Sequence, residues 1–257
     1  MMKLIGMFDS PFVRPVAVSA KLLGIQFEHV NWSVGKDFDR IRQYSPLGRV
    51  PTLVLDDGEV LVECSAMLDY LDDLVGSERA LLPATGAERR AALRLMALAY
   101  GAAEKAREEI VDRVFRPAEK RHLPWIERCR SQLRGALAEL ERHAAQKRDA
   151  QWLVGGRLTQ ADVYVSCIFT FLTEAVPAAF NAADYPMLRA HVARVEAMPE
   201  FRQTRAPWSA PTTSVAATAS RSSPSSAGRK RRARRVVAKK RRTTSHREAR
   251  SNRKRSR

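Results

Sequence analysis

Residues 45–71 read SPLGRVPTLVLDDGEVLVECSAMLDYL and hold the clearest structural pattern in the chain. Two apolar runs, Pro51–Leu55 and Glu59–Val62, flank the turn Asp56-Asp57-Gly58. An Asp-Gly turn between two apolar runs is a strong signal of a β-hairpin. Over residues 64–75 the apolar side chains recur with helical spacing. The stretch therefore predicts a loop, a hairpin and a helix, in that order.

The residues before this stretch predict two strands and two helices. Lys3–Phe8 is an apolar run, and Ser10 and Pro11 follow it as a favoured N-cap and a favoured first helical residue. After that helix, Phe27–Val30 predicts a strand and Asp37–Tyr44 a short amphipathic helix. The N-terminal part is thus expected to run strand, helix, strand, helix, hairpin, helix (βαβαββα).

After residues 77–86 the pattern becomes purely helical. The expected helices cover Ala87–Val114, Trp125–Gln146, Gln160–Thr173 and Met187–Met198. Thr159 and Asp162 have the spacing of a capping box, which is a structural role. From Trp208 onward no apolar period remains, so that segment cannot offset its ordering entropy. We predict an α/β domain at 1–78, an all-α domain at 86–207 and a disordered Arg/Lys-rich tail at 208–257.

The net charge of +17 is concentrated in that tail. Residues 208–257 contain 17 Lys and Arg and one acid, Glu248, whereas residues 1–207 contain 28 basic and 27 acidic residues. The charge therefore says nothing about the ligand of the folded part. For the tail it leaves three interpretations open: a disordered extension without a role, a shifted reading frame that runs past the normal end of the folded protein, or non-specific binding of nucleic acid.

Other motifs limit the chemistry and the location. The three cysteines and five histidines are isolated, so neither a disulfide framework nor a metal site is expected. No apolar stretch has the length of a membrane span, and no secretory signal is visible at the start. We expect a cytoplasmic protein without a membrane partner.

The segments SPFVRPV (10–16), SPLGRVPTL (45–53), VECSAMLDYL (62–71) and GGRLTQADV (155–163) resemble, in order and spacing, those of glutathione transferases. The similarity is to serine-type, bacterial-like cytosolic members. It implies a thioredoxin-like N-terminal domain followed by an all-α domain. It also implies glutathione as co-substrate, a small electrophile as second substrate and assembly as a homodimer.

In the family the thiolate of glutathione is the nucleophile, so the site must lower a thiol pKa. A hydroxyl donor and a helix N-terminus both favour the anion, and Ser10 offers both. The resemblance therefore makes Ser10 the candidate catalytic residue, although a serine that only caps the helix would look the same. Pro15 departs from the family pattern and is expected to distort or delay the start of this helix.

The resemblance implies several further glutathione contacts. Val50 and Pro51 match a cis-proline loop whose backbone pairs with the cysteinyl part, and Arg49 could reach the glycyl carboxylate. Glu63 would hold the γ-glutamyl amine, whereas Cys64 replaces the usual serine hydroxyl with a weak S–H donor. The resemblance also implies that Phe12 contacts glutathione and that Tyr100 contacts the second substrate.

Two functions follow from this comparison of residues. The first is an enzyme that conjugates or reduces electrophilic small molecules with glutathione. The alternative is a binding or regulatory protein that keeps the fold without efficient catalysis, which the departures at Pro15 and Cys64 would favour.

Overall fold

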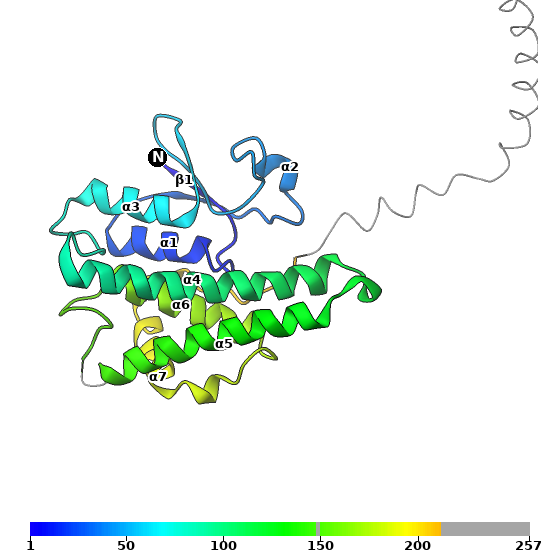
Figure 1. Cartoon of the computed structure of the whole chain (residues 1–257). Helices are drawn as coiled ribbons and strands as arrows, with labels where there is room; N and C mark the ends of the chain where they lie inside the picture. Colours follow the sequence, from blue (N-terminus) through cyan, green and yellow to red (C-terminus); the bar gives the residue numbers. More distant parts are fainter. Residues whose placement is uncertain (148–149, 212–257) are drawn as a thin grey trace, which may run out of the picture. The chain divides into compact units, whose positions relative to one another are not determined.

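A computed structural model describes residues 1–147 and 150–211 of the 257-residue chain (Figure 1). Residues beyond 211 are outside the described residues. The predictions that the basic tail is disordered and that it binds nucleic acid fall on these residues. Within the described part, no helix is long and apolar enough to cross a membrane. Within those same ranges, no cluster of three or more His, Cys, Asp or Glu side chains could hold a metal ion.

The N-terminal part is a thioredoxin-like domain, in the predicted order of elements. Its sheet has the strand order β2-β1-β3-β4, with β1 parallel to β2 and antiparallel to β3, and β3 antiparallel to β4. Helices α1 and α3 pack against each other, and α1 also packs on α6 of the second domain (Figure 1). The elements are β1 (Lys3–Ile5), α1 (Val13–Leu22), β2 (Glu28–Val30), α2 (Phe38–Ile41), β3 (Thr52–Val54), β4 (Val60–Val62) and α3 (Cys64–Val75).

The C-terminal part is all helical, as predicted. Helix α6 is its centre, because almost every side chain along it is buried, and the long helix α4 packs against both α6 and α5 (Figure 1). The capping box of Thr159 and Asp162 is present at the start of α6. The helices are α4 (Gly86–Phe115), α5 (Leu123–Gln146), α6 (Gln160–Ala175), α7 (Pro186–Glu196) and α8 (Pro199–Gln203), with single 3-10 turns at Ala118–Lys120 and Ala182–Asp184.

Helix α1 begins later than the sequence predicted. Its first helical residue is Val13 and its N-cap is Phe12, so the assignment of Ser10 as N-cap and Pro11 as first helical residue was wrong. The later start accommodates Pro15. It is now the third helical residue, where a backbone N–H would have no partner inside the helix.

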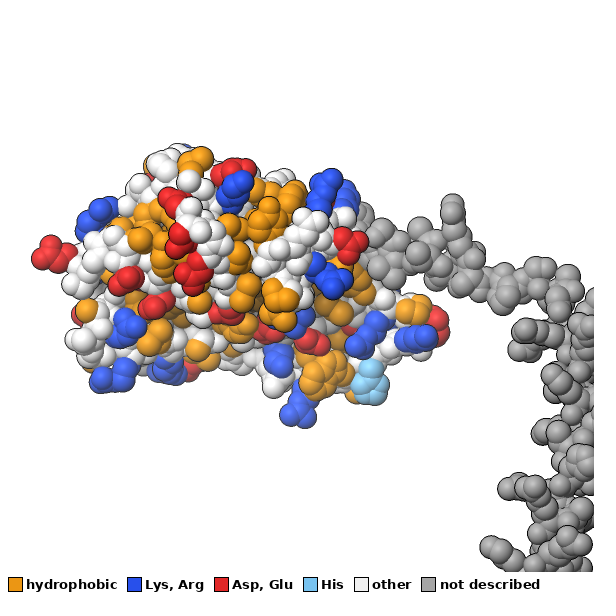
Figure 2. Space-filling model, turned by 90° about the horizontal axis from the view of Figure 1, so that it is seen from above, with side chains coloured by type: hydrophobic (Ala, Val, Ile, Leu, Met, Phe, Trp, Pro, Cys, Tyr) orange, Lys and Arg blue, Asp and Glu red, His pale blue; other side chains and the backbone are white. Residues whose placement is uncertain are grey.

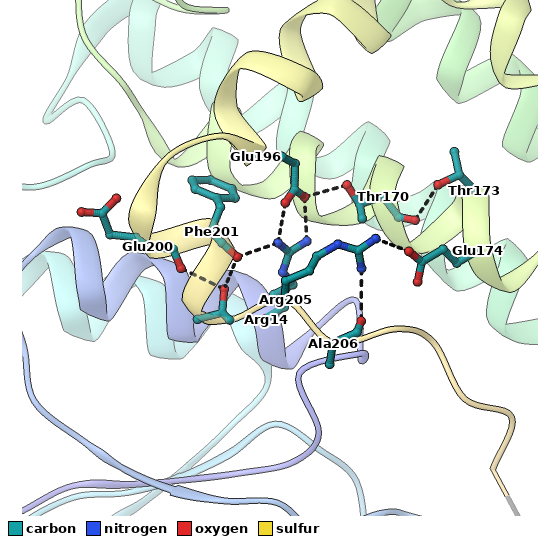
Figure 3. Close-up of polar contacts among 10 residues, drawn as sticks. Arg14, Thr170, Thr173, Glu174, Glu196, Glu200, Phe201, Arg205 and Ala206 are labelled. Carbon is teal, nitrogen blue, oxygen red and sulfur yellow. Dashed lines mark hydrogen bonds and ion pairs between the residues drawn. The ribbon is translucent and has the colours of Figure 1, made fainter.

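A buried ion pair joins the two domains at the start of α1 (Figure 3). Arg14, 3% exposed, donates two hydrogen bonds to the Glu196 carboxylate of α7, at 2.7 and 2.6 Å, and a third to the carbonyl of Phe201 in α8. Thr170 of α6 donates to the same carboxylate. The network therefore fixes α1, and the loop that precedes it, against three helices of the second domain.

The surface charge of the folded part is mixed. The face shown in Figure 2 carries acidic, basic and apolar side chains interspersed. This agrees with the near balance of charges over residues 1–207.

Candidate functional site

One pocket gathers every predicted site residue except Ser10. It lies where the loop before β3 and the start of α3 meet α4 and the start of α1. Its lining comprises Phe12, Ser45, Leu47, Arg49, Val50, Pro51, Val62, Glu63, Cys64 and Tyr100. These residues lie in separate segments of the sequence, and the fold brings them together in this pocket.

The loop before β3 has the predicted backbone. The Val50-Pro51 peptide bond is cis. Within the described residues, neither the N–H nor the C=O of Val50 takes part in a hydrogen bond. Gly6, with a φ of +135°, lets this loop approach the end of β1, since a Cβ there would lie 2.9 Å from that of Val50. The loop thus presents a free backbone donor and acceptor beside the pocket.

Glu63 stands at the start of α3 in an uncommon conformation. Its φ is +81°, in a region that non-glycine residues seldom adopt. Its carboxylate accepts a hydrogen bond from the backbone N–H of Ser65 at 2.8 Å and another from the Ser65 hydroxyl. The acidic group is therefore positioned at the helix N-terminus, and Ser65 supports it without lining the pocket.

Cys64 is a buried residue and not a reactive thiol. Its side chain is 1% exposed, and burial raises the pKa of the thiol far above its ordinary value of 9.0, against the opposing effect of a hydrogen bond with Tyr164. The thiol stays protonated at neutral pH. What the helix start offers to an anion is its backbone N–H groups.

Ser10 lies just before α1 and does not line the pocket. Its hydroxyl oxygen accepts a hydrogen bond from the N–H of Phe12 at 3.3 Å, and its carbonyl accepts one from the N–H of Arg14. These contacts hold the turn that precedes α1, whereas the capping role that the sequence left open is not observed, because Phe12 is the N-cap. The Ser10 hydroxyl proton remains available for donation to an anion, because the oxygen acts only as acceptor in these contacts.

Helix α4 forms the opposite wall. The Tyr100 ring lies 5.3 Å from the Phe12 ring, centroid to centroid. Burial, followed by the charge of Glu104, raises the pKa of the Tyr100 phenol, so this group stays protonated. Arg49 is half exposed, and its guanidinium lies 3.5 Å from the Glu104 carboxylate.

Sequence reasoning missed four residues of the site. Ser45, Leu47 and Val62 line the pocket, and Glu104 pairs with Arg49. The first three lie inside the family-like segments 45–53 and 62–71, and this position was the signal in the sequence that could have identified them as site residues. Glu104 has the helical spacing of i+4 from Tyr100, which places both on one face of α4.

Known proteins resemble this chain over most of its length. The family models for the glutathione S-transferase N-terminal and C-terminal domains match residues 4–79 and 124–194. Glutathione S-transferase GstA of Escherichia coli O157:H7 is 30% identical over 159 residues, which cover 62% of this chain and 73% of that protein.

Two further comparisons extend the match. The uncharacterized GST-like protein YibF of Escherichia coli K12 is 27% identical over 211 residues, 80% of this chain and 99% of that protein. A crystal structure of a glutathione S-transferase from Methylobacterium radiotolerans, in complex with glutathione sulfonate, superposes with a TM-score of 0.74 at 28% identity. It covers 81% of this chain and 95% of the other. Together with the pocket and the cis-proline loop, these matches show that the chain belongs to the glutathione S-transferase family.

Proposed function

We propose that this protein is a glutathione transferase that joins glutathione to electrophilic small molecules, or reduces them with it. One observation carries the proposal. A single pocket combines the free backbone of Val50, before the cis-proline, with the N-terminus of α3 and the carboxylate of Glu63. An extended tripeptide pairs with a free strand edge, and a helix N-terminus binds a carboxylate.

Each part of glutathione has a partner in this arrangement. The cysteinyl backbone pairs with Val50, and the γ-glutamyl amine lies against Glu63. The γ-glutamyl carboxylate meets the backbone N–H groups at the start of α3. Arg49 turns from Glu104 toward the glycyl carboxylate, because its own side chain is half exposed and Glu104 keeps its ion pair with Arg107.

The chemistry follows from the thiolate. The glutathione thiol loses its proton to solvent, and the Ser10 hydroxyl donates a hydrogen bond that stabilises the sulfur anion. The sulfur then attacks the electrophilic carbon, an S–C bond forms, and the leaving group departs with its bonding electrons. Phe12 and Tyr100 offer an apolar wall for the second substrate.

Calorimetric titration with glutathione, together with turnover of a chloro-nitroaromatic followed by absorbance, tests this function. We expect saturable binding below millimolar glutathione and a rate above the uncatalysed reaction. A folded protein that shows no heat of binding at millimolar glutathione would refute the proposal.

A non-catalytic binding protein of the same fold is the second candidate. Two observations favour it: Ser10 does not line the pocket, and the Cys64 thiol is buried and protonated. The two candidates differ in one measurement. A binding protein would take up glutathione, and its negligible turnover would not change on substitution of Ser10.

We also propose that the protein is a cytoplasmic homodimer. Helix α3 exposes Asp69 and Asp73, and α4 exposes Arg90 and Arg94, so two copies can oppose acidic and basic faces. A groove between these helices adds apolar surface through Leu61 and Leu82, among other residues. Sedimentation equilibrium at micromolar concentration should give twice the chain mass, and monomer mass alone would refute the dimer.

A further inference from the structure

The hairpin formed by α4 and α5 ends in an exposed tip. Every residue from Phe115 to Trp125 is exposed to solvent, and we call this segment the α4–α5 tip. In Figure 1 the joined ends of the two helices extend past the other labelled helices. The Arg121 guanidinium donates to the carbonyls of Arg113 and Arg116 at the end of α4, so the tip is tied to that helix.

Three large apolar side chains of the α4–α5 tip face solvent. Leu123 is 73% exposed, Phe115 44% and Trp125 41%. Single exposed apolar side chains are ordinary, whereas a group of them marks an interaction surface. All three lie at one end of the hairpin, on the last residue of α4 and the first turn of α5. The tip therefore offers an apolar contact to a partner outside the chain.

The same end of the hairpin carries an excess of cations. Arg116 pairs with Asp112 of α4, so its charge is already balanced. The acidic residue of the tip is Glu119, and the next acid along the chain, Glu127, is paired with Arg134. The exposed cations that take no part in an ion pair within the described residues are Lys120, Arg121 and Arg128. The surroundings of the apolar side chains thus favour an anionic partner.

An anionic lipid surface uses both properties of the tip. Lipid phosphates accept from the cations, Trp and Lys side chains sit at the level of the headgroups, and Leu and Phe reach the boundary of the acyl chains. A nucleic acid fits less well. The Lys105 ammonium lies over the Trp125 ring at 5.8 Å and covers one stacking face, and Leu123 would stay in water.

The tip remains accessible in the dimer proposed above. That dimer uses Arg90 and Arg94 near the start of α4. Phe115, at the other end of the same helix, lies about 30 Å from Arg94 at a rise of about 1.5 Å per residue. A second copy bound in that way leaves the tip free for a different partner.

We propose that the α4–α5 tip docks this protein on an anionic lipid membrane, with Phe115, Leu123 and Trp125 in the interfacial layer. The sequence predicted no membrane partner because it contains no span, but docking on the surface needs none. Apolar contacts of this size give marginal binding unless a polybasic segment adds to them. Such a segment is attached close by, since Trp208, where the Arg/Lys-rich stretch starts, packs under Arg113 at the end of α4.

Flotation of the full chain with vesicles tests the proposal. The vesicles contain equal parts of phosphatidylglycerol and phosphatidylcholine. Leu123→Ser should weaken partition to them about tenfold, because it removes the most exposed apolar side chain of the tip. Leu74→Ser is the matched control, since Leu74 of α3 is 50% exposed and lies outside the tip. Both variants should keep the wild-type melting temperature. The basic segment is the same in all three proteins, so the comparison isolates the tip.

Fluorescence shows whether the tip enters the lipid. Vesicles with brominated acyl chains should quench the tryptophan fluorescence of the wild-type protein, and Trp125→Phe should bind but lose this quenching. The other tryptophans are half-buried in the fold. Partition that is the same for the wild-type and Leu123→Ser proteins would overturn the proposal, as would quenching that persists in Trp125→Phe.

Two further outcomes would assign the tip to another partner. If Leu123→Ser weakens binding to duplex DNA and leaves vesicle binding unchanged, the tip contacts nucleic acid. If Leu123→Ser changes the mass found by sedimentation equilibrium, the tip contacts a second copy of the chain. Either result would overturn membrane docking, and neither depends on whether the protein binds glutathione.

Discussion

At the scale of single residues, Ser10 decides between the two candidate functions. Its hydroxyl keeps a free proton while its oxygen accepts from Phe12. Ser10→Ala should raise the pKa of the bound glutathione thiol and lower kcat/KM roughly 10- to 100-fold, as expected for loss of a hydrogen bond to an anion. The thiolate absorbance of the complex as a function of pH measures the first effect directly. Ser10→Thr keeps a hydroxyl and serves as the control. Unchanged turnover in Ser10→Ala would favour the binding protein.

Cys64 gives a prediction about stability and pH. Its thiol is protonated in the folded state, whereas in the unfolded chain it titrates near 9.0. A raised folded pKa means that the contribution to stability is complete below the unfolded pKa and is lost as the pH rises above it. From about pH 9 upward the wild-type protein should lose up to about 1.4 kcal/mol per pH unit through this group.

Cys64→Ser tests that loss, because serine does not titrate in this range. Urea unfolding at a series of pH values should show a smaller alkaline slope for Cys64→Ser than for the wild-type protein. Cys167, whose pKa burial raises to about 12, contributes a similar loss in both proteins. Equal slopes would mean that the Cys64 thiol ionises in the folded state.

At the scale of elements, the Arg14–Glu196 pair holds α1 against α7 (Figure 3). Removing one partner of a buried ion pair leaves the other charge uncompensated, which costs about 3–5 kcal/mol. Arg14→Met should therefore destabilise the protein strongly, and the double variant Arg14→Met with Glu196→Leu should recover much of the loss. Urea unfolding measures both. Arg142→Ala, which removes a solvent-exposed pair with Glu139 on α5, is the control and should change little. A similarly small change in Arg14→Met would contradict this account.

The elements show how far the sequence could predict the structure. The Asp-Gly hairpin and the helical periods are local signals, so the order of strands and helices and the capping box of α6 were predicted correctly. The start of α1 was not predicted correctly. Ser10-Pro11 favours a helix start at that point, whereas Pro15 favours a later one. The outcome also depends on the long-range ion pair between Arg14 and Glu196. The five-residue helix α8 is too short for a periodic signal. Glu104 joins the site only through the packing of α4 against the loop before β3, a tertiary contact that no local pattern contains.

At the scale of the whole molecule, the chain after α8 ties the two domains together beside the candidate catalytic residue. The N–H of Trp208 donates to Glu174 of α6, and the Arg113 guanidinium lies over the Trp208 ring at 5.6 Å. Ser209 then donates from both its N–H and its hydroxyl to Asp9, the residue before Ser10. Burial raises the pKa of Asp9, partly offset by these Ser209 bonds. The sequence placed the start of the tail at residue 208, yet these contacts extend past that point.

Two truncated chains test this segment. A chain that ends at Pro211 keeps every contact named above and should match the full chain in melting temperature and turnover. A chain that ends at Pro207 loses the cation–π contact and the hydrogen bonds to Glu174 and Asp9, together about 1–2 kcal/mol. For a folded part of this size, that loss lowers the melting temperature by roughly 2–8 °C. Turnover should fall as well, because Ser209 no longer holds Asp9 and the loop that carries Ser10. Identical behaviour of the two truncated chains would show that the fold ends at residue 207, because the contacts of Trp208 and Ser209 would then contribute nothing to stability or to the site.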